Sequence, residues 1–308
     1  MSTDKMRLLL ISAMYENGGN ITHRLFDGHP RMLVYPFESQ LGTRYVVDHL
    51  TSFFPVKYRW PRFLLGSSPE EDYEAIIDEE CKVRSKTPRV SKFRHVPFDL
   101  DDRRRREEFV RLVGSEPRTT GGNVAAFFRA TFASWENLAR SGEETVWVGY
   151  SPVVVVDAER ILRDMADSLV LHIVRNPYSA YADTKKRPVP LSPAAYMAGW
   201  TFCQQQALIF RELFPGRVEL LRYEDIIADP AGTLGDYCRR IGLDRSDTLG
   251  RPSWNGAPLA EVYPWGTIRL PDEETNRKTA CELSPPEIAE IGARAGPYLK
   301  LLGYEGFI

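Results

Sequence analysis

The chain has 308 residues, of which 43% are hydrophobic and 27% are charged, values that are ordinary for a protein with a sizeable core. Its formal net charge is −2, which excludes a general positive field for nucleic acid or an anionic membrane surface, so any anion site must be local. No apolar stretch approaches the roughly 20 residues needed to span a bilayer, and the first apolar run is too short for a signal peptide. We therefore expect a cytoplasmic protein, and the sequence carries no signal for its oligomeric state.

The four cysteines, Cys81, Cys203, Cys238 and Cys281, lie far apart in the sequence. They form no CxxC pair, and no histidine stands near them in the pattern of a zinc site. We predict free, buried thiols in a reducing compartment and no bound metal.

The first predicted element is a buried strand over Met6–Ser12, and the loop AMYENGGN separates it from a helix predicted over Ile21–Asp27. Gly18 and Gly19 allow the backbone to bend back, with its N–H groups near the positive end of the helix dipole. Asn20 is the predicted N-cap. This strand, loop and helix predict a P-loop-like phosphate site; the alternative is a turn that carries glycine only to change direction.

A second short strand is predicted over Arg31–Val34, and a helix over Thr43–Phe54. The later charge run DDRRRREE, Asp101–Glu108, is typical of a solvated helical face with offsetting ion pairs. Another helix is predicted in the sequence NVAAFFRATFASWENLAR. Its aromatic side chains indicate a core, or alternatively the wall of an acceptor pocket. They are Phe127, Phe128, Phe132 and Trp135.

Two further buried strands are predicted, over Thr145–Tyr150 and Leu169–Val174, before a serine-capped helix over Ser192–Phe214. Arg175 follows the second of these strands directly. Ligands of open parallel sheets bind beyond the carboxyl ends of the strands, so Arg175 is well placed for a phosphate or sulfate. The alternative is a surface arginine in a turn.

Strands that alternate with helices predict an α/β protein with a central, mainly parallel sheet. We expect one domain over residues 1–308. Roughly residues 61–144 are predicted to form a mostly helical insertion.

These motifs resemble, in order and spacing, the sulfotransferases that use 3′-phosphoadenosine 5′-phosphosulfate (PAPS). The loop, the helix and the DGHP turn at residues 27–30 are similar to the family's 5′-phosphosulfate loop and its following helix. Arg175 opens a segment that is similar to the 3′-phosphate segment. LLRYEDIIADPAGTLGDYCRRIGL, Leu220–Leu243, resembles the family's strand, RYED corner and helix, and ELSPPEIAEIGARAGPYLKLLGY resembles its closing helix. Residues 61–144 contain no motif that matches.

The resemblance implies a three-layer sandwich and an enzyme that moves a sulfuryl group from PAPS to a hydroxyl of a small molecule or carbohydrate. The product would be adenosine 3′,5′-bisphosphate (PAP), and no metal is required. The implied donor-binding residues lie in the first loop, after Arg175, and in the polar loop Arg269–Lys278, which often folds over the nucleotide in the family. They are Asn17, Gly18, Gly19, Asn20, Ile21, Thr22, Arg175, Asp183, Thr184, Lys185, Arg187, Arg277 and Lys278.

The first departure from the family pattern is Glu16, which stands where the family has a basic residue on the sulfuryl group. A carboxylate in contact with a phosphosulfate is repelled by roughly 1 to 4 kcal/mol. We expect Glu16 to point elsewhere or to act on the acceptor. The family's usual hydroxyls fall at Gly19 and Asn20.

The second departure is Asp183, which stands where the family usually has a serine on the 3′-phosphate. Thr184 and the cluster Lys185, Lys186 and Arg187 follow at once. We expect these residues to supply the missing charge in a rearranged donor site.

Sulfuryl transfer requires a base for the acceptor proton. Glu38 is the preferred candidate, because a glutamate after the second strand has this role in part of the family; the alternative is a loop carboxylate or an ion-pair partner. His23, near the start of the first helix, is instead a candidate for direct contact with the sulfuryl group, and His95 is a weaker candidate for the base. We expect His29 to be a turn residue and His172 to be structural.

In the RYED motif, we expect Tyr223 and Glu224 to fix the corner between strand and helix, while Arg222 is compatible with either role. Three other functions compete with sulfuryl transfer. A related binding or scaffold protein that has lost donor chemistry is compatible with Glu16 and Asp183. A phosphotransferase lacks its GxxxxGK[ST] motif here, and a nicotinamide-dependent dehydrogenase lacks GxGxxG.

Overall fold

The computed structural model describes residues 6–115, 117–259 and 272–308, with a five-stranded sheet at the centre in the order β2-β3-β1-β4-β5. All four strand pairs are parallel, as predicted. The strands are β1 (Arg7–Ala13), β2 (Met32–Val34), β3 (Val146–Tyr150), β4 (Leu169–Val174) and β5 (Val218–Arg222), and a separate hairpin joins β6 (Ser253–Trp254) to β7 (Ala257–Pro258).

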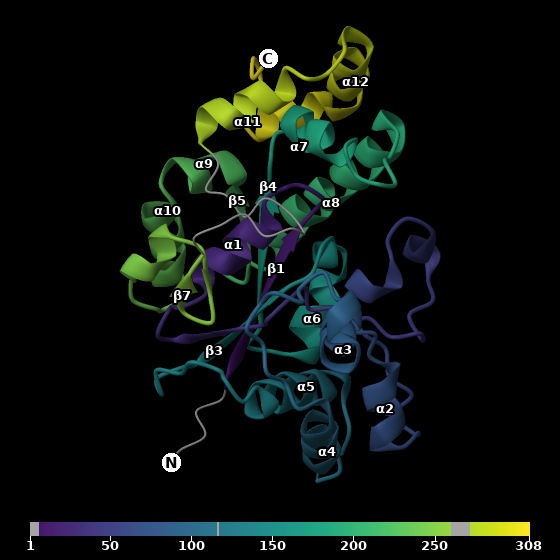
Figure 1. The fold of residues 1–308 in the computed structure, drawn as a ribbon. Helices are drawn as coiled ribbons and strands as arrows, with labels where there is room; N and C mark the ends of the chain where they lie inside the picture. Colours follow the sequence, from purple (N-terminus) through teal and green to yellow (C-terminus); the bar gives the residue numbers. More distant parts are fainter. Residues whose placement is uncertain (1–5, 116, 260–271) are drawn as a thin grey trace.

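Helices cover both faces of the sheet (Figure 1). Leu8 and Leu10 of β1 belong to one hydrophobic core, and Leu9 and Ile11 belong to the other. Because successive strand residues point to opposite faces, the sheet is the middle layer of a three-layer sandwich. The helices are α1 (Gly19–Phe26), α2 (Pro69–Ala75), α3 (Glu79–Lys86), α4 (Asp102–Val113), α5 (Thr120–Ser134), α6 (Ala158–Asp164), α7 (Pro177–Thr184), α8 (Pro193–Leu213), α9 (Tyr223–Ala228), α10 (Pro230–Arg240), α11 (Glu273–Ala280) and α12 (Pro285–Leu301).

The helix predicted over Thr43–Phe54 is wrong. The backbone there forms only a short 3-10 turn, His49–Ser52, and the Asp48 carboxylate accepts a hydrogen bond from the Leu50 N–H. Thr43 instead bridges to Ile76. Local side-chain bonds of this kind compete with helix formation.

The predicted insertion contains α2, α3, α4 and α5. The charge run lies in α4 and is largely solvated, except at Arg105, which is fully buried. Its guanidinium donates to Asp78 and Asp102, each at 2.7 Å, and to the Tyr73 hydroxyl at 2.8 Å. The prediction of a purely solvated face is therefore wrong at this position. The aromatic residues of the α5 region are buried in the core, as the first interpretation predicted.

Three cysteines are free and buried, as predicted, but Cys281 is exposed at the end of α11. The prediction of a buried thiol is wrong there, because the residue follows the last turn of a surface helix. Among the residues that the structure describes, no helix is both long and apolar enough to cross a membrane.

The order of the strands creates a crevice between the carboxyl ends of β1 and β4. The chain leaves β1 through α1 toward β2 at one edge, and it leaves β4 through α7 and α8 toward β5 at the other. Neighbouring strands whose connections run in opposite directions open a ligand-binding crevice at their carboxyl ends. In Figure 1, α7, α11 and α12 gather beyond this end of β4, and α7 contacts both other helices.

Candidate active site

The loop between β1 and α1 passes between two aromatic rings. Gly18 is the N-cap of α1 and has a φ of 88°, a left-handed conformation that favours glycine. A Cβ atom on Gly18 would overlap the Tyr223 ring, and one on Gly19 would overlap the Tyr150 ring. The predicted N-cap, Asn20, is wrong, because Asn20 lies inside the first turn of α1. Since the first N–H groups of a helix have no partner within it, this turn offers donors and a positive dipole end to an anion.

The side chains of Ile21 and Thr22 point into the protein. Ile21 packs in the core behind the sheet, and the Thr22 hydroxyl donates to the Gly18 carbonyl at 2.9 Å. Only the backbone of these two residues is therefore oriented for contact with a ligand at the helix N-terminus.

Asn17 ties the loop to the rest of the crevice. Its side-chain amide donates to the Tyr15 carbonyl and the Tyr196 hydroxyl, each at 2.9 Å. Its Oδ1 accepts from the Arg175 N–H at 2.9 Å and from Trp200 Nε1 at 3.2 Å. Asn17 is fully buried, so its side chain holds the strand ends together and only its backbone is available for a donor.

Arg175 lies at the carboxyl end of β4, where the sequence predicts an anion site, and is only 6% exposed. Its Nε donates to Asn276 Oδ1 at 2.8 Å, and its Nη1 donates to the Glu16 carbonyl at 2.9 Å and to Asp183 at 2.8 Å. The guanidinium also lies 5.0 Å from the centre of the Tyr223 ring. Burial opposes its charge, but Tyr223 and Asp183 raise the pKa of Arg175. The arginine is therefore a fixed cation in a dry setting.

Glu224 of the RYED motif fixes this corner, in agreement with the structural role expected for it. Its Oε1 accepts from the N–H and the side-chain amide of Asn176, at 3.1 and 2.8 Å, and from Asn276 at 3.1 Å. Its Oε2 accepts from the Tyr304 hydroxyl at 2.8 Å. Asn276 is a site residue that sequence reasoning missed. It lies within the predicted polar loop, but nothing in the sequence distinguishes its amide from the charges beside it.

Glu16 has a left-handed backbone with a φ of 59°. Its side chain is exposed to solvent yet closely surrounded by protein. The resulting desolvation raises the pKa of the Glu16 carboxyl. The Arg187 charge lowers this pKa, and the Asp183 charge raises it further. The Glu38 charge raises this pKa as well, so Glu16 lies within electrostatic range of Arg187, Asp183 and Glu38.

The predicted basic cluster after α7 divides between different partners. The Lys185 ammonium lies 3.1 Å from the Glu287 carboxylate of α12. Lys186 pairs with Asp183 at 3.3 Å and with Glu282 at 2.7 Å. Both lysines therefore neutralise carboxylates of the protein itself.

Arg187 has a different position from the two lysines. Its guanidinium lies 4.7 Å from the centre of the Tyr15 ring, beside the β1–α1 loop. Thr184 is buried, and its hydroxyl donates to the Ala180 carbonyl at 2.8 Å. Of the residues predicted to compensate for Asp183, Arg187 is the cation nearest to the loop by these contacts.

The segment predicted to be a polar loop before the closing helix is helical over α11, so that part of the prediction is wrong; residues 269–271 lie outside the described residues. Arg277 donates to the Phe307 carbonyl at 3.2 Å, and its guanidinium lies 5.2 Å from the Phe307 ring. Lys278 pairs with Glu274 at 2.6 Å on the exposed face of the helix. Both cations lie in the last turn of α11 and have protein partners at the surface.

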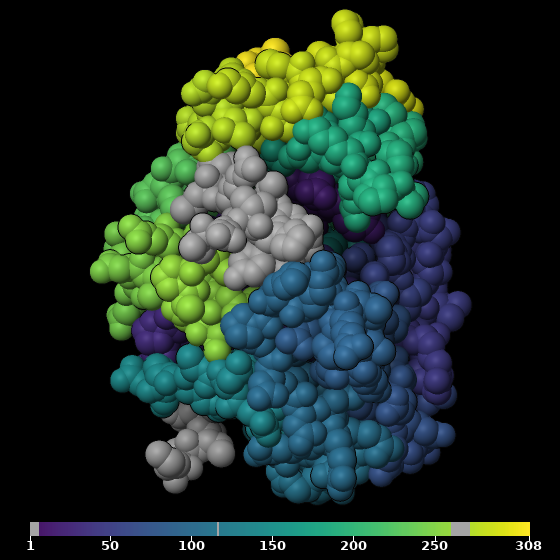
Figure 2. Space-filling view, viewed as in Figure 1, coloured from purple at the N-terminus to yellow at the C-terminus, as the bar shows by residue number. Residues whose placement is uncertain are grey.

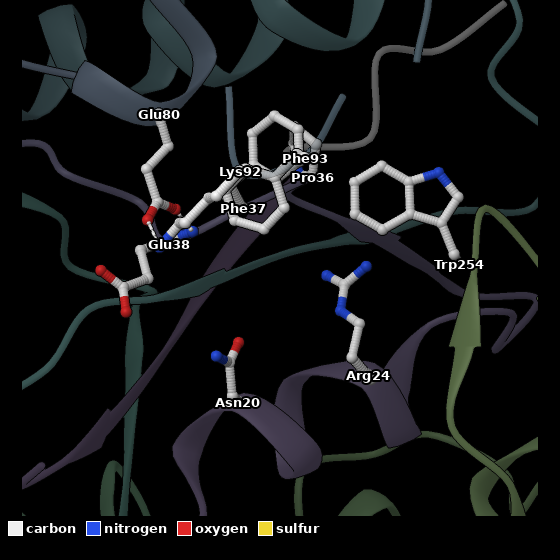
Figure 3. A pocket seen from close by; sticks show the side chains of 9 residues that line it. All are labelled: Asn20, Arg24, Pro36, Phe37, Glu38, Glu80, Lys92, Phe93 and Trp254. Atoms are coloured by element: carbon white, nitrogen blue, oxygen red, sulfur yellow. Dashed lines mark hydrogen bonds and ion pairs between the residues drawn. The ribbon is translucent and has the colours of Figure 1, made fainter. Parts of the chain in front are cut away.

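Glu38 lies in a small pocket beside the N-terminus of α1 (Figure 3). Its carboxylate is half-buried, hydrogen-bonds the Tyr58 hydroxyl, and lies 3.4 Å from Gln40 Nε2. The Glu38 N–H donates to Glu80 Oε2 at 3.1 Å. The predicted base is thus held by defined partners. The pocket is lined by Asn20, Arg24, Pro36, Phe37, Glu38, Glu80, Lys92, Phe93 and Trp254.

Glu80, on α3, is a second carboxylate of this pocket that sequence reasoning missed. It is 8% exposed and forms an ion pair with Lys92. Burial and the neighbouring Glu38 charge raise the pKa of Glu80 to about 7, whereas Lys92 lowers it. Glu80 therefore loses its proton near neutral pH, next to the backbone N–H of Glu38, the predicted base.

Three of the histidines, His23, His29 and His172, have structural partners. His23 is 1% exposed, lies beside Arg24 and the Tyr150 ring, and hydrogen-bonds the Val148 backbone. Burial and the Arg24 charge hold the pKa of His23 well below its usual value. A direct contact of this imidazole with a sulfuryl group stays a prediction.

His172 hydrogen-bonds Gln204 at 3.0 Å in the core, and burial lowers the pKa of His172 to about 4. His29 stabilises its turn, since its Nδ1 accepts from the Arg31 N–H at 3.1 Å. His95 is exposed in a turn between α3 and α4. The structural roles predicted for His172 and His29 agree with these contacts.

The crevice opens to the surface. Figure 2 shows a hollow in which the purple N-terminal segment lies deep between the teal segment around α7 and the blue helical segment. The α1 N-terminus, Arg175 and Glu38 thus combine N–H donors, a fixed cation and a candidate base at one end of the sheet. Such an arrangement suits transfer of an anionic group between two bound molecules.

Comparison with known proteins agrees with this chemistry. A family model described as "Sulfotransferase family" matches residues 64–247, which includes most of the helical segment in which no motif was recognised. The solved structure of the sulfotransferase domain from the Synechococcus PCC 7002 olefin synthase is 14% identical. It aligns over 96% of this chain and 97% of its own, with a TM-score of 0.54.

The sulfotransferase domain from the curacin biosynthetic pathway is 15% identical and also has a TM-score of 0.54. It aligns over 96% of this chain and 98% of its own. No curated protein sequence matches the chain significantly. At these identities the two structures establish a shared fold.

Proposed function

Since the chain belongs to the sulfotransferase family, we propose that it transfers a sulfuryl group from PAPS to a hydroxyl of a small molecule or carbohydrate. The observation that carries the proposal is the junction of the β1–α1 loop with Arg175 through Asn17. It brings a helix N-terminus and a buried cation together at the switch point of a parallel sheet.

The donor would bind with its 5′-phosphosulfate at the N-terminus of α1 and its 3′-phosphate beside Arg175. The backbone N–H groups of residues 19–21 and the dipole of α1 favour the first anion. Arg175, with Arg187 beside the loop, favours the second. The side chains of Asn17, Ile21 and Thr22 are engaged within the protein, so the loop would act through its backbone.

Glu38 would take the proton of the acceptor hydroxyl. The acceptor oxygen forms a bond to sulfur while the bond from sulfur to the bridging phosphate oxygen breaks, and PAP leaves with the negative charge. Tyr58 and Gln40 orient the Glu38 carboxylate, which reduces the entropy lost on reaching the transition state. The aromatic rings of Phe37, Phe93 and Trp254 would form the acceptor side of this pocket.

One observation favours a second function, a binding protein without donor chemistry. Asp183 already forms an ion pair with the Arg175 guanidinium. Glu16 adds a further carboxyl within electrostatic range of both residues. If these charges prevent donor binding, only the ancestral fold is retained.

Calorimetric titration with PAP distinguishes the two functions without knowledge of the acceptor. We expect micromolar or tighter binding that weakens at least about tenfold in Arg175→Ala, the loss typical of a charge-assisted hydrogen bond. Arg211→Ala, on the exposed face of α8, is the control for loss of one positive charge. Absence of binding would assign the chain to the second function.

A further inference from the structure

The ion pair between Arg175 and Asp183 has a role beyond local stability. Building on the proposed donor site, we propose that Asp183 is an internal counter-anion that the 3′-phosphate of the donor displaces from Arg175. Asp183 then pairs with Lys186 alone. The carboxylate thereby sets the affinity for the 3′-phosphorylated nucleotide, and not for the 5′ group.

Asp183 bridges two cations that differ in their freedom to move. Its Oδ2 lies 2.8 Å from Arg175 Nη1, and its Oδ1 lies 3.3 Å from Lys186 Nζ. The Arg175 side chain is 8% exposed, whereas that of Asp183 is 31% exposed and that of Lys186 is 50% exposed. Arg175 is therefore fixed, whereas the Asp183 carboxylate can rotate toward solvent without leaving Lys186.

Two protein groups hold Arg175 independently of Asp183. Asn276 accepts from its Nε, and the Glu16 carbonyl accepts from its Nη1. The guanidinium therefore keeps its orientation when the carboxylate departs. It remains in place to bind an incoming phosphate.

The position of Asp183 in α7 supports a functional interaction rather than a helix-stabilising one. The residue lies in the last turn of the helix, which ends at Thr184. A negative charge there opposes the negative end of the helix dipole, so it does not stabilise the helix. The favourable contacts of the carboxylate are those with Arg175 and Lys186.

A phosphate beside Arg175 would meet like charge from Asp183. The neighbouring Glu16 carboxyl already responds to Asp183, which raises its pKa, so the two groups lie within electrostatic range. Rotation of Asp183 toward Lys186 relieves this repulsion and exchanges one anion for another on the arginine. Because Arg175 gives up one anion to bind another, the 3′-phosphate contributes less to the binding free energy than it would at an unpaired arginine.

The test is calorimetric titration of the full chain and of Asp183→Asn with two probes, PAP and adenosine 5′-monophosphate, which lacks the 3′-phosphate. We expect PAP to bind about tenfold more tightly to the variant, as the removal of a competing charge-assisted bond predicts. Affinity for the monophosphate should stay within about twofold. Asp236→Asn, an exposed carboxylate that pairs with Arg239 and Arg245, is the control for loss of one negative charge.

A double-mutant cycle with Lys186→Gln tests the second position of the carboxylate. Lys186→Gln should weaken PAP binding in the wild-type background and have little effect in the Asp183→Asn background. Asp183→Ala serves as a second variant if the asparagine amide still occupies Arg175, and thermal unfolding monitors the fold of each protein.

Each outcome separates this inference from the proposed function. If the wild type binds PAP and Asp183→Asn binds it equally or more weakly, the displacement is wrong and the donor site stands. An equal gain for both probes also overturns it, because the effect would not belong to the 3′-phosphate. If no protein binds either nucleotide, the donor site itself is wrong.

Discussion

Asn17 and Arg175 join the loop after β1 to the carboxyl end of the neighbouring strand β4: the Arg175 N–H donates to Asn17 Oδ1 at 2.9 Å across 158 positions of the sequence. The same amide group contacts Tyr196 and Trp200 of α8. One buried side chain therefore sets the distance between the loop at the N-terminus of α1 and the cation at the end of β4. The two parts of the proposed donor site are positioned by the same residue.

The first prediction concerns this junction. Asn17→Ala removes four hydrogen bonds and leaves buried partners unsatisfied, so we expect the free energy of unfolding to fall by about 2 to 4 kcal/mol. Urea denaturation measures the change. Asn20→Ala, three residues later in the first turn of α1, is the matched control and should change the value by less than about 0.5 kcal/mol. Equal effects of the two variants would contradict the role of Asn17.

A second prediction follows from the packing of the loop. Gly18→Ala places a Cβ atom against the Tyr223 ring at a φ of 88°. We expect a loss of about 2 kcal/mol or more in the free energy of unfolding, together with weaker PAP binding.

The control for Gly18 is Gly66→Ala, where an added Cβ would meet no atom within 4 Å among the described residues. This change should leave both the unfolding free energy and PAP affinity within error. A stable Gly18→Ala protein with unchanged PAP affinity would show that the loop tolerates displacement.

The third prediction separates Arg187 from Lys185. Arg187 lies beside Tyr15 of the β1–α1 loop, whereas Lys185 pairs with Glu287 of α12. We expect Arg187→Ala to weaken PAP binding about tenfold and Lys185→Ala to weaken it less than about threefold, by calorimetry. If neither change has an effect, the basic cluster does not compensate for Asp183.

The fourth prediction is a pH dependence of stability from Glu80. Its pKa is raised from 4.5 to about 7 in the folded protein, so the folded state holds a proton that the unfolded state has lost in this range. Stability from this group is complete below pH 4.5 and is lost as the pH rises through about 7.

Urea denaturation of the wild type and Glu80→Gln between about pH 4 and pH 8 measures this dependence. The wild type should lose up to about 3 kcal/mol relative to the variant over this range, since one pKa unit corresponds to about 1.4 kcal/mol. Titration of Glu80 is coupled to Glu38, so the two carboxyls share the transition. Parallel profiles would contradict a raised pKa for Glu80.

The fifth prediction concerns the base. Glu38→Gln should lower the rate of sulfuryl transfer by about 10² to 10⁴-fold, the usual contribution of general base catalysis. PAP affinity should stay within about twofold, because Glu38 contacts the acceptor side. Glu305→Gln, an exposed carboxylate near the C-terminus, is the control. A variant that keeps the wild-type rate would exclude Glu38 as the base.

The sequence predicted those features that depend on local patterns. β4 has the predicted bounds, and Arg175 lies at its carboxyl end, because a continuous apolar run in a parallel sheet ends where polar residues begin. The helix predicted over Thr43–Phe54 failed because the Asp48 side chain caps a single turn there.

Contacts between distant parts of the chain could not be predicted. Asn276 meets Arg175 across 101 positions, and Glu80 meets the Glu38 N–H across 42 positions. Neither residue belongs to a motif, and their amide and carboxylate groups gain a role only through tertiary packing. The sequence therefore identified the cation and the candidate base but not the groups that hold them.

The most direct test of the central claim is conversion of PAPS to PAP by the purified protein with a mixed panel of phenols, alcohols and sugars. Chromatography measures PAP, and mass spectrometry detects sulfated products. We expect PAP to form together with at least one sulfated acceptor, and both to decrease in Arg175→Ala and Glu38→Gln. PAP binding by calorimetry without PAP formation or a sulfated product from any member of the panel would contradict sulfuryl transfer and support a binding protein.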